Sequence, residues 1–211
     1  RRLGRQYRPN LRSTPIPVTA SRTALTDLAD APTDAARMTP TERRSAGALS
    51  AIYALRMLGL FIVLPVFALQ AQHYPGGDNP ALVGLAMGIY GLTQALLQVP
   101  LGMASDRLGR KPVIIAGLAL FAIGSAVAAW APTMTWLVIG RALQGGGAIS
   151  AAVTALLADL TRDEVRTKSM ALVGISIALM FALSLVLAPV LVPHIGLAGL
   201  FLLTAALALT G

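Results

Sequence analysis

The sequence predicts an all-α polytopic membrane protein in which six transmembrane helices are joined by short loops. Of its 211 residues, 55% are hydrophobic and only 12% are charged, whereas a soluble domain carries about 25% charged residues. Apolar runs follow one another from about residue 49 to the last residue, most of them near the roughly 20 residues that cross a bilayer as a helix. Lys and Arg gather in alternate loops between these runs, as expected for a chain that crosses a membrane repeatedly.

Residues 1–37 form a separate predicted domain, a disordered basic extension. Scattered arginine, proline, serine and threonine occur there without a periodic apolar pattern, and such a composition cannot bury enough apolar surface to fold. Met38 is followed by a short polar stretch typical of a cytoplasmic start. Two interpretations stay open: an extension upstream of a native start at Met38, and a basic arm that binds anionic lipid.

Residues 38–211 are the second predicted domain and contain the six helices. Asn79 and Pro80 mark the start of the second helix, because Asn caps helices and Pro suits their first turn. Pro65 interrupts the first apolar run, and Pro189 lies near the end of the fifth, where we expect a helix kink. The runs are, in order, about 49–69, 82–103, 113–130, 136–158, 170–192 and 197–209.

The loops predict the orientation of the helices. The loops at 72–79, 131–135 and 193–196 contain no Lys or Arg. By the positive-inside rule the cationic segments stay in the cytoplasm, so both termini are predicted to be cytoplasmic. The cations are Arg37, Arg43 and Arg44 before the first run, Arg107, Arg110 and Lys111 after the second, and Arg162, Arg166 and Lys168 after the fourth.

The loop after the second run carries the most specific motif, formed by Gly102, Asp106, Arg107, Gly109, Arg110 and Lys111. This pattern resembles the signature of the major facilitator superfamily, a glycine followed by D-R-x-G-R-K after the second transmembrane helix. The resemblance implies the amino-terminal six-helix half of a transporter, with a carboxy-terminal six-helix half missing from this chain. It also implies that the loop is a conformational latch in which Asp106 docks on that half. A solvated loop that only sets topology is the alternative.

The next cytoplasmic loop supplies predicted charge partners for the latch. Asp159 and Glu164 are candidates to pair with Arg107, Arg110 or Arg166 and to exchange partners as the two halves move.

Two arginines interrupt apolar runs. Arg141 and Gln144 stand in a stretch that resembles the superfamily's R-x-x-Q-G-x-G signature, associated with proton coupling in some members; the alternative is an arginine that reaches the outer headgroups. Arg56 lies about two turns from the cytoplasmic end of the first run, where a functional role and such snorkelling are equally open. Its surroundings are similar to the first helix of bacterial YajR-type transporters, in the drug/proton antiporter branch.

The second run also has a polar face, because Tyr90, Gln94 and Gln98 recur every fourth residue. These side chains line a substrate path or join helices by hydrogen bonds, and both interpretations stay open. The glycines at 84, 88 and 91 fit close helix packing, and those at 145–147 either pack closely or loosen the fourth helix. In the fifth run Pro189 matches the antiporter branch, but the branch's glycines are replaced by Ser184 and Ala188.

The predicted function is secondary active transport, as proton-coupled efflux of small molecules or drugs across a bacterial inner membrane. Proton-coupled uptake of a metabolite or sugar is one alternative, and a truncated, non-transporting membrane fragment or interaction protein is another. The expected partners are a small-molecule substrate, protons, the lipid bilayer and the missing half. No enzyme, cofactor or metal site is predicted, because there is no cysteine, His73 and His194 stand alone, and no GK[ST] loop occurs. The low aromatic content argues against nucleic acid.

Overall fold

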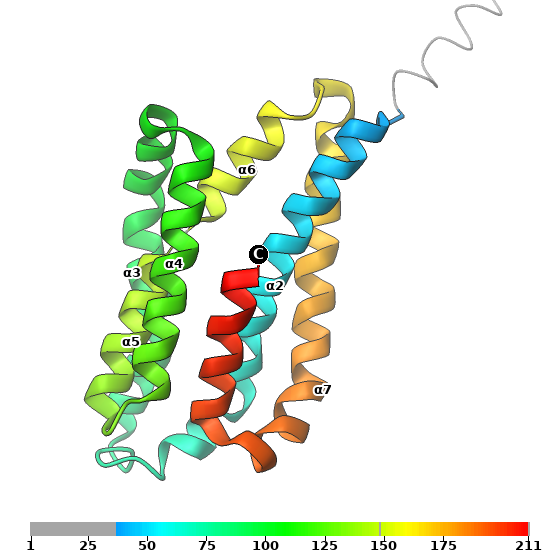
Figure 1. Ribbon diagram of the computed structural model, residues 1–211. Coiled ribbons are helices and arrows are strands. Elements are labelled where there is room, and N and C mark those ends of the chain that lie inside the picture. The colour runs from blue at the N-terminus through cyan, green and yellow to red at the C-terminus, as the bar shows by residue number, and fades with distance from the viewer. Residues whose placement is uncertain (1–36, 148, 211) are drawn as a thin grey trace, which may run out of the picture. The chain divides into compact units, whose positions relative to one another are not determined.

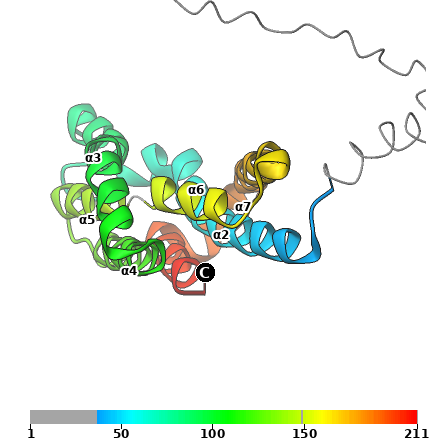
Figure 2. The same cartoon turned by 90° about the horizontal axis from the view of Figure 1, so that it is seen from above.

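A computed structural model describes residues 37–147 and 149–210, and the described residues from 38 onward form a bundle of helices (Figures 1 and 2). The prediction for residues 1–37 therefore lies almost wholly outside the described residues. The first described helix is α2, Pro40–Ala71. It begins with a capping box: the Glu42 amide donates to Thr39 Oγ1 at 3.2 Å, and the Thr39 amide donates to Glu42 Oε2 at 2.7 Å.

Helices α3 (Pro80–Leu108) and α4 (Arg110–Ala129) follow, joined by one residue. As predicted, Asn79 is the N-cap of α3, and its side chain accepts a hydrogen bond from the Ala81 amide at 3.0 Å. Gly109 has φ = +96°, a left-handed conformation that side chains with a Cβ atom rarely adopt. This glycine of the D-R-x-G-R-K motif therefore permits the abrupt turn between the two helices.

The predicted fourth span is not one helix. The structure divides it into α5 (Met134–Gly146) and α6 (Ser150–Asp159). Consecutive glycines precede the break, and glycine is unfavourable inside a helix by about 1 kcal/mol relative to alanine. A Cβ atom on Gly147 would collide with the Gly117 carbonyl and lie 2.9 Å from Phe121 Cβ, so the chain also passes close to α4 here.

The predicted fifth and sixth spans occur together in α7, Asp163–Thr210. Figure 1 shows this segment running to one end of the unit, reversing, and returning beside α2. Gly196 has non-helical dihedrals, φ = +63° and ψ = −175°, whereas Pro189 and Pro193 lie inside the helix. The reversal is therefore centred on Gly196. The backbone at Pro189, where we expected a kink, keeps helical dihedrals.

Four of the described helices, α2, α3, α4 and α7, are long and apolar enough to cross a membrane. With 13 and 10 residues, α5 and α6 are each too short to do so alone. Residues 37–147 and 149–210 thus form an all-helical unit with four helices that can cross a membrane. That the chain crosses the membrane six times remains a prediction.

The helices pack around two apolar clusters. One joins α2 to α4 and α6 through residues such as Tyr53, Phe121 and Leu157. The other joins α2 to α5 and α7 through Phe67, Leu137 and Phe201. Much of the apolar surface of α3 and α7 is left exposed, as is usual for surfaces that meet lipid or another membrane segment.

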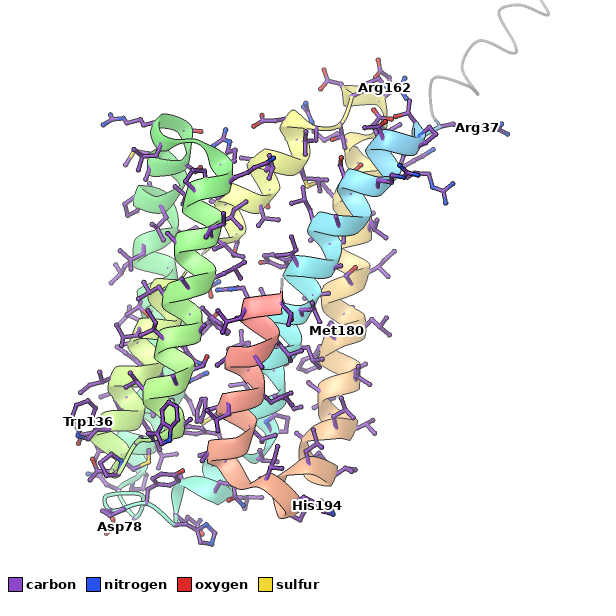
Figure 3. The ribbon with its side chains drawn as sticks, viewed as in Figure 1. Arg37, Asp78, Trp136, Arg162, Met180 and His194 are labelled. Carbon is purple, nitrogen blue, oxygen red and sulfur yellow. The ribbon has the colours of Figure 1, made fainter. Side chains whose placement is uncertain are left out.

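The two ends of the helical unit differ in charge. Asp78, Trp136 and His194 mark one end, and Arg162 marks the other (Figure 3). The loops without Lys or Arg and the cationic loops therefore lie at opposite ends, which is the arrangement that a positive-inside topology requires.

Candidate functional site

The two arginines inside apolar runs are both buried among the helices. The side chain of Arg56 is 0% exposed and that of Arg141 is 1% exposed. Neither reaches the surface of the helical unit, so neither is held by snorkelling to the headgroups in this structure. Buried cations require hydrogen-bond acceptors, and both arginines find acceptors on neighbouring helices.

Arg141 connects three helices from its position on α5. Its Nε donates to the carbonyl of Ala86 on α3 at 3.3 Å, and its Nη1 donates to Gln144 Oε1 at 3.0 Å. Gln144 in turn donates from Nε2 to Ser125 Oγ on α4 at 2.7 Å. These hydrogen bonds fix the positions of both Arg141 and Gln144 of the R-x-x-Q motif. Ser125 also takes part in them, and the sequence did not predict its role.

Arg56 reaches from α2 to α3 and to the break after α5. Its Nη2 donates to the hydroxyl of Tyr90 at 3.0 Å and to the carbonyl of Gly147 at 3.3 Å. Its guanidinium lies 5.0 Å from the centre of the Phe121 ring, and that of Arg141 lies 5.0 Å from the centre of the Tyr90 ring. Tyr90 thus joins the two arginines, through its hydroxyl and through its ring face. We call Arg56, Tyr90, Ser125, Arg141 and Gln144 the arginine network.

The arginine network carries positive charge without a carboxylate. The ion pairs formed within the described residues are Arg110 with Asp106 and Asp159, Arg162 with Glu42, and Arg166 with Asp163. A buried charge without a counter-charge is costly, and cation–π contacts return only about 0.5–2 kcal/mol each. A site that bears this cost is a candidate for function.

Glycines determine how close the helices of the site approach. A Cβ atom on Gly145 would collide with Thr93 Oγ1 and the Tyr90 carbonyl of α3, and one on Gly140 would lie 2.7 Å from the Ala128 amide of α4. The glycines of α5 therefore pack closely, and the chain also breaks at Gly147. Gly84, Gly88 and Gly91 have nothing within 4 Å of a built Cβ atom, so the prediction that they pack closely is wrong for the described unit.

The other polar residues of α3 stand apart from the arginine network. Gln94 and Gln98 are half-buried, and their Oε1 atoms have no hydrogen-bond partner among the described residues. Of the predicted polar face of α3, the structure brings only Tyr90 into contact with Arg56 and Arg141.

The D-R-x-G-R-K loop is organised by Arg110. Its guanidinium pairs with Asp106 one turn earlier, donates from Nε to Asp159 Oδ2 at 3.1 Å, and donates from Nη1 to Ser105 Oγ at 2.8 Å. These pairings raise the pKa of Arg110, first through the hydrogen bond to Asp159. Arg110 thus ties the end of α3 to the end of α6. Arg107 and Lys111 are exposed.

A further ion pair lies at the same end and was not predicted. Glu42, the third residue of α2 and part of its capping box, accepts from Arg162 Nε at 2.9 Å and from the Arg162 amide at 3.1 Å. The hydrogen bond from Arg162 lowers the pKa of Glu42 to about 2. Arg166 pairs with Asp163 at 2.7 Å, and Glu164 adds to Glu42 in raising the pKa of Arg162.

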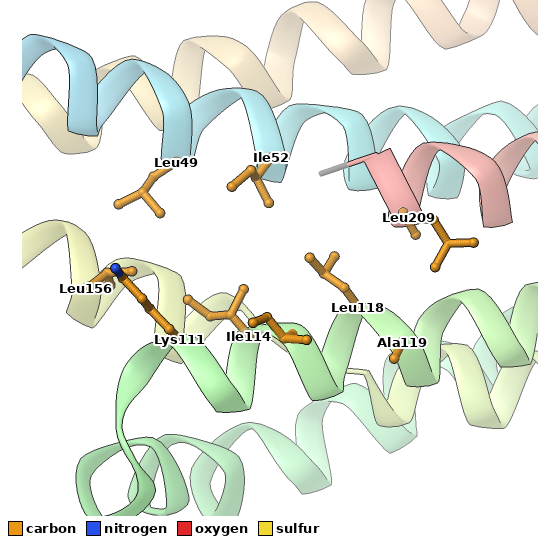
Figure 4. A pocket seen from close by; sticks show the side chains of 10 residues that line it. Leu49, Ile52, Lys111, Ile114, Leu118, Ala119, Leu156 and Leu209 are labelled. Carbon is orange, nitrogen blue, oxygen red and sulfur yellow. The ribbon is translucent and has the colours of Figure 1, made fainter.

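An apolar groove of about 390 Å³ lies between α2, α4, α6 and the end of α7. Leu49, Ile52, Leu118 and Leu209 line it, and Lys111 stands at its edge (Figure 4). None of the arginine network residues is in its lining, so the groove is separate from the candidate site.

Comparisons with known proteins show which family and which relatives this chain resembles. Residues 49–211 match the family model of the Major Facilitator Superfamily. The inner membrane transport protein YajR of Escherichia coli (strain K12) is 51% identical over 175 residues, which are 83% of this chain and 38% of that protein. The tetracycline resistance protein, class E, of Escherichia coli is 31% identical over 125 residues, 58% of this chain and 31% of that protein. The multidrug resistance protein MdtH of Yersinia enterocolitica is 37% identical over 114 residues, 53% of this chain and 28% of that protein. The chain spans less than half the length of these relatives.

Proposed function

This chain belongs to the major facilitator superfamily, a family of transporters rather than an enzyme class, and from that premise we propose that it forms the amino-terminal six-helix half of a proton-coupled efflux transporter for small molecules. Residues 38–211 are the transmembrane half, and residues 1–37 precede it as an extension. The names of the tetracycline and multidrug resistance relatives support efflux of drug-like compounds. The name of YajR supports a bacterial inner membrane.

The observation that carries this proposal is the buried positive charge of the arginine network. Arg141 is held at the junction of α3, α4 and α5 by Ala86 and Gln144. A cation raises the electrostatic potential around it, and a nearby carboxylate then loses its proton more readily. A carboxylate on the second half would release its proton when the two halves bring it close to Arg141, and would bind a proton when they separate. Transport and proton movement are thereby coupled.

The substrate path follows α3. The amide oxygens of Gln94 and Gln98 are buried and have no hydrogen-bond partner among the described residues. In this proposal a small rotation of the two side chains on the largely exposed α3 presents these oxygens to a substrate, and Tyr90 stands on the same face of the helix. Polar groups spaced along an otherwise apolar surface orient a substrate without binding it too tightly to leave.

Arg110 and its two ion-pair partners, Asp106 and Asp159, form the conformational latch. In the proposed orientation, with both termini cytoplasmic, Gly102 to Lys111 and the partners Asp159, Glu164 and Arg166 face the cytoplasm. Asp106 and Asp159 share one arginine. A competing contact from the second half can therefore withdraw Asp106 while Asp159 still satisfies Arg110, so the charge is never left unpaired.

Accumulation of a fluorescent substrate in bacterial cells tests this function. Cells that express the full-length transporter are loaded with a tetracycline or a fluorescent dye, with and without a protonophore. Efflux predicts lower accumulation than in cells with empty vector, restored to the vector level by the protonophore. Accumulation above the vector level would indicate uptake instead. Equal accumulation, with the protein present in the inner membrane and for every compound tried, would indicate a non-transporting membrane protein.

A further inference from the structure

A pocket of about 630 Å³ lies between the end of α2 and the start of α3. It is at the end of the helical unit marked by Asp78, opposite the cationic loops (Figure 3). We propose that this pocket binds a drug-sized organic cation with apolar groups, and that Asp78 is the counter-charge. No residue of the arginine network is in its lining, so the proposal does not depend on what the protein transports or on how transport is coupled to protons.

The size and the lining of the pocket suit such a molecule. Ligand pockets in proteins measure about 300–1,000 Å³ and are lined mainly by apolar side chains with a few polar groups. Both helices contribute apolar side chains here, and the polar groups come from the loop that joins them. The lining includes the apolar residues Ala68, Val83 and Met87, the polar residues Gln72 and Asp78, and Gly84.

The α3 side of the pocket has room for a ligand. Gly84 belongs to the lining, and a Cβ atom built on it has nothing within 4 Å. Met87 lies about one turn further along α3 and is 37% exposed. An unbranched methionine side chain adapts its shape to a neighbouring group. The pocket therefore combines open space at Gly84 with an adaptable apolar wall at Met87.

Asp78 determines the charge of the ligand. It is the only Asp, Glu, Lys or Arg in the loops at 72–79, 131–135 and 193–196, and it takes part in none of the ion pairs between described residues. Asn79 rather than Asp78 caps α3, by accepting from the Ala81 amide. The carboxylate of Asp78 is therefore available to a ligand, and it attracts a cation and repels an anion.

The loop holds Asp78 in place beside the pocket. The Gly77 amide donates to the Tyr74 carbonyl at 2.8 Å, so the loop is closed by a hydrogen bond of its own. The Met134 amide at the start of α5 donates to the Pro75 carbonyl at 3.1 Å, which ties the loop to a neighbouring helix. A loop that is already ordered loses little conformational entropy when a ligand binds.

An organic cation fits this pocket better than a metal ion does. Ca²⁺ takes about six to eight oxygen ligands, whereas the described residues contain no group of three or more His, Asp or Glu side chains that could hold a metal. The apolar walls favour a ligand that carries hydrocarbon or aromatic groups. Gln72 adds an amide oxygen that can accept a hydrogen bond from a protonated amine.

Tetraphenylphosphonium and tetraphenylborate are suitable probes, because both carry four phenyl groups and their charges are opposite. The full-length transporter is purified in detergent, and the Kd of each ion is measured by isothermal titration calorimetry. The phosphonium is expected to bind more than tenfold more tightly than the borate. Asp78→Asn is expected to raise the Kd of the phosphonium about fivefold and to make it insensitive to added salt.

Substitutions on α3 locate the site. Gly84→Leu fills the open space of the pocket and is expected to weaken phosphonium binding at least tenfold. Gly91→Leu is the matched control, because Gly91 also has nothing within 4 Å of a built Cβ atom but is not in the lining, and it should leave binding unchanged. In a cysteine-free background, bound phosphonium is expected to protect Met87→Cys from N-ethylmaleimide, but not Leu85→Cys, which is on α3 outside the lining.

Three results would each overturn the proposal. The first is an equal Kd of the two ions for the wild type, and the second is a Kd of the phosphonium that Asp78→Asn does not change. The third is a Met87→Cys variant that is labelled equally with and without the phosphonium, or that is never labelled because the second half of the transporter fills the pocket.

Discussion

The closest helix contact in the candidate site gives the sharpest test of the structure. Replacing Gly145 by alanine would place a Cβ atom 3.0 Å from the carbonyl carbon of Tyr90, and closer still to its carbonyl oxygen and to Thr93 Oγ1. Two of these atoms belong to the backbone of α3, and Thr93 Oγ1 is held by the carbonyls of Ile89 and Tyr90. The collision cannot be relieved by rotating one flexible side chain, so α3 and α5 must separate.

The expected cost follows from two opposing effects. Overpacking costs about 1–3 kcal/mol, and a backbone collision belongs at the upper end of that range. The better helix propensity of alanine returns about 1 kcal/mol. Gly145→Ala should therefore be destabilised by about 2 kcal/mol, which lowers the melting temperature by roughly 4–8 °C for a chain of this size. Transport should also fall, because the separation carries Tyr90 away from Arg56 and Arg141.

Thermal unfolding in detergent, followed by circular dichroism, measures this change against a matched control. Gly88→Ala lies on α3 with nothing within 4 Å of its built Cβ atom, so it should melt at the wild-type temperature or slightly above. If Gly145→Ala melts no lower than Gly88→Ala, the close contact between α3 and α5 is wrong.

Three other perturbations test separate parts of the account. Ser125→Ala leaves the buried Gln144 amide without its acceptor, so it should cost about 1–3 kcal/mol of stability in the same melting assay. Because the pKa of Glu42 is lowered from 4.5 to about 2, its stabilising effect is present above pH 4.5 and is lost as the pH falls towards 2; the difference in melting temperature between the wild type and Glu42→Gln should shrink over that range. In the cysteine-free chain, Asp78→Cys should react with an impermeant thiol reagent added outside intact cells, and Leu108→Cys should not, whereas the reverse would overturn the proposed orientation.

Local signals in the sequence were sufficient to predict much of the helical framework. The cap at Asn79 and the turn motif containing Gly109 act over a few residues, and the structure places helix ends there. The alternation of loops with and without Lys and Arg predicted which loops lie together at each end of the helical unit. For Arg141 the sequence left two interpretations open, a partner inside the protein and snorkelling to the headgroups, and the structure shows the side chain buried beside Gln144.

What sequence reasoning missed depends on contacts between distant residues. Ser125 is an ordinary residue of an apolar run until α5 brings Gln144 to it. Glu42 and Arg162 are 120 positions apart, so no spacing rule connects them. The glycines of α3 and α5 look alike in sequence, and only the positions of the neighbouring helices show that Gly145 is packed against α3 and Gly88 is not.

The central claim is that the buried charge of Arg141 couples substrate movement to the proton gradient, and Arg141→Ala in the full-length transporter tests it most directly. Membranes are first checked for wild-type abundance of the variant. Transport is then measured in two modes in proteoliposomes: concentrative transport driven by a pH gradient, and equilibrium exchange without a gradient. The account predicts that Arg141→Ala loses concentrative transport while retaining exchange, because the pathway persists and only its link to protons is removed. Concentrative transport at the wild-type rate, with an unchanged dependence on pH, would contradict it.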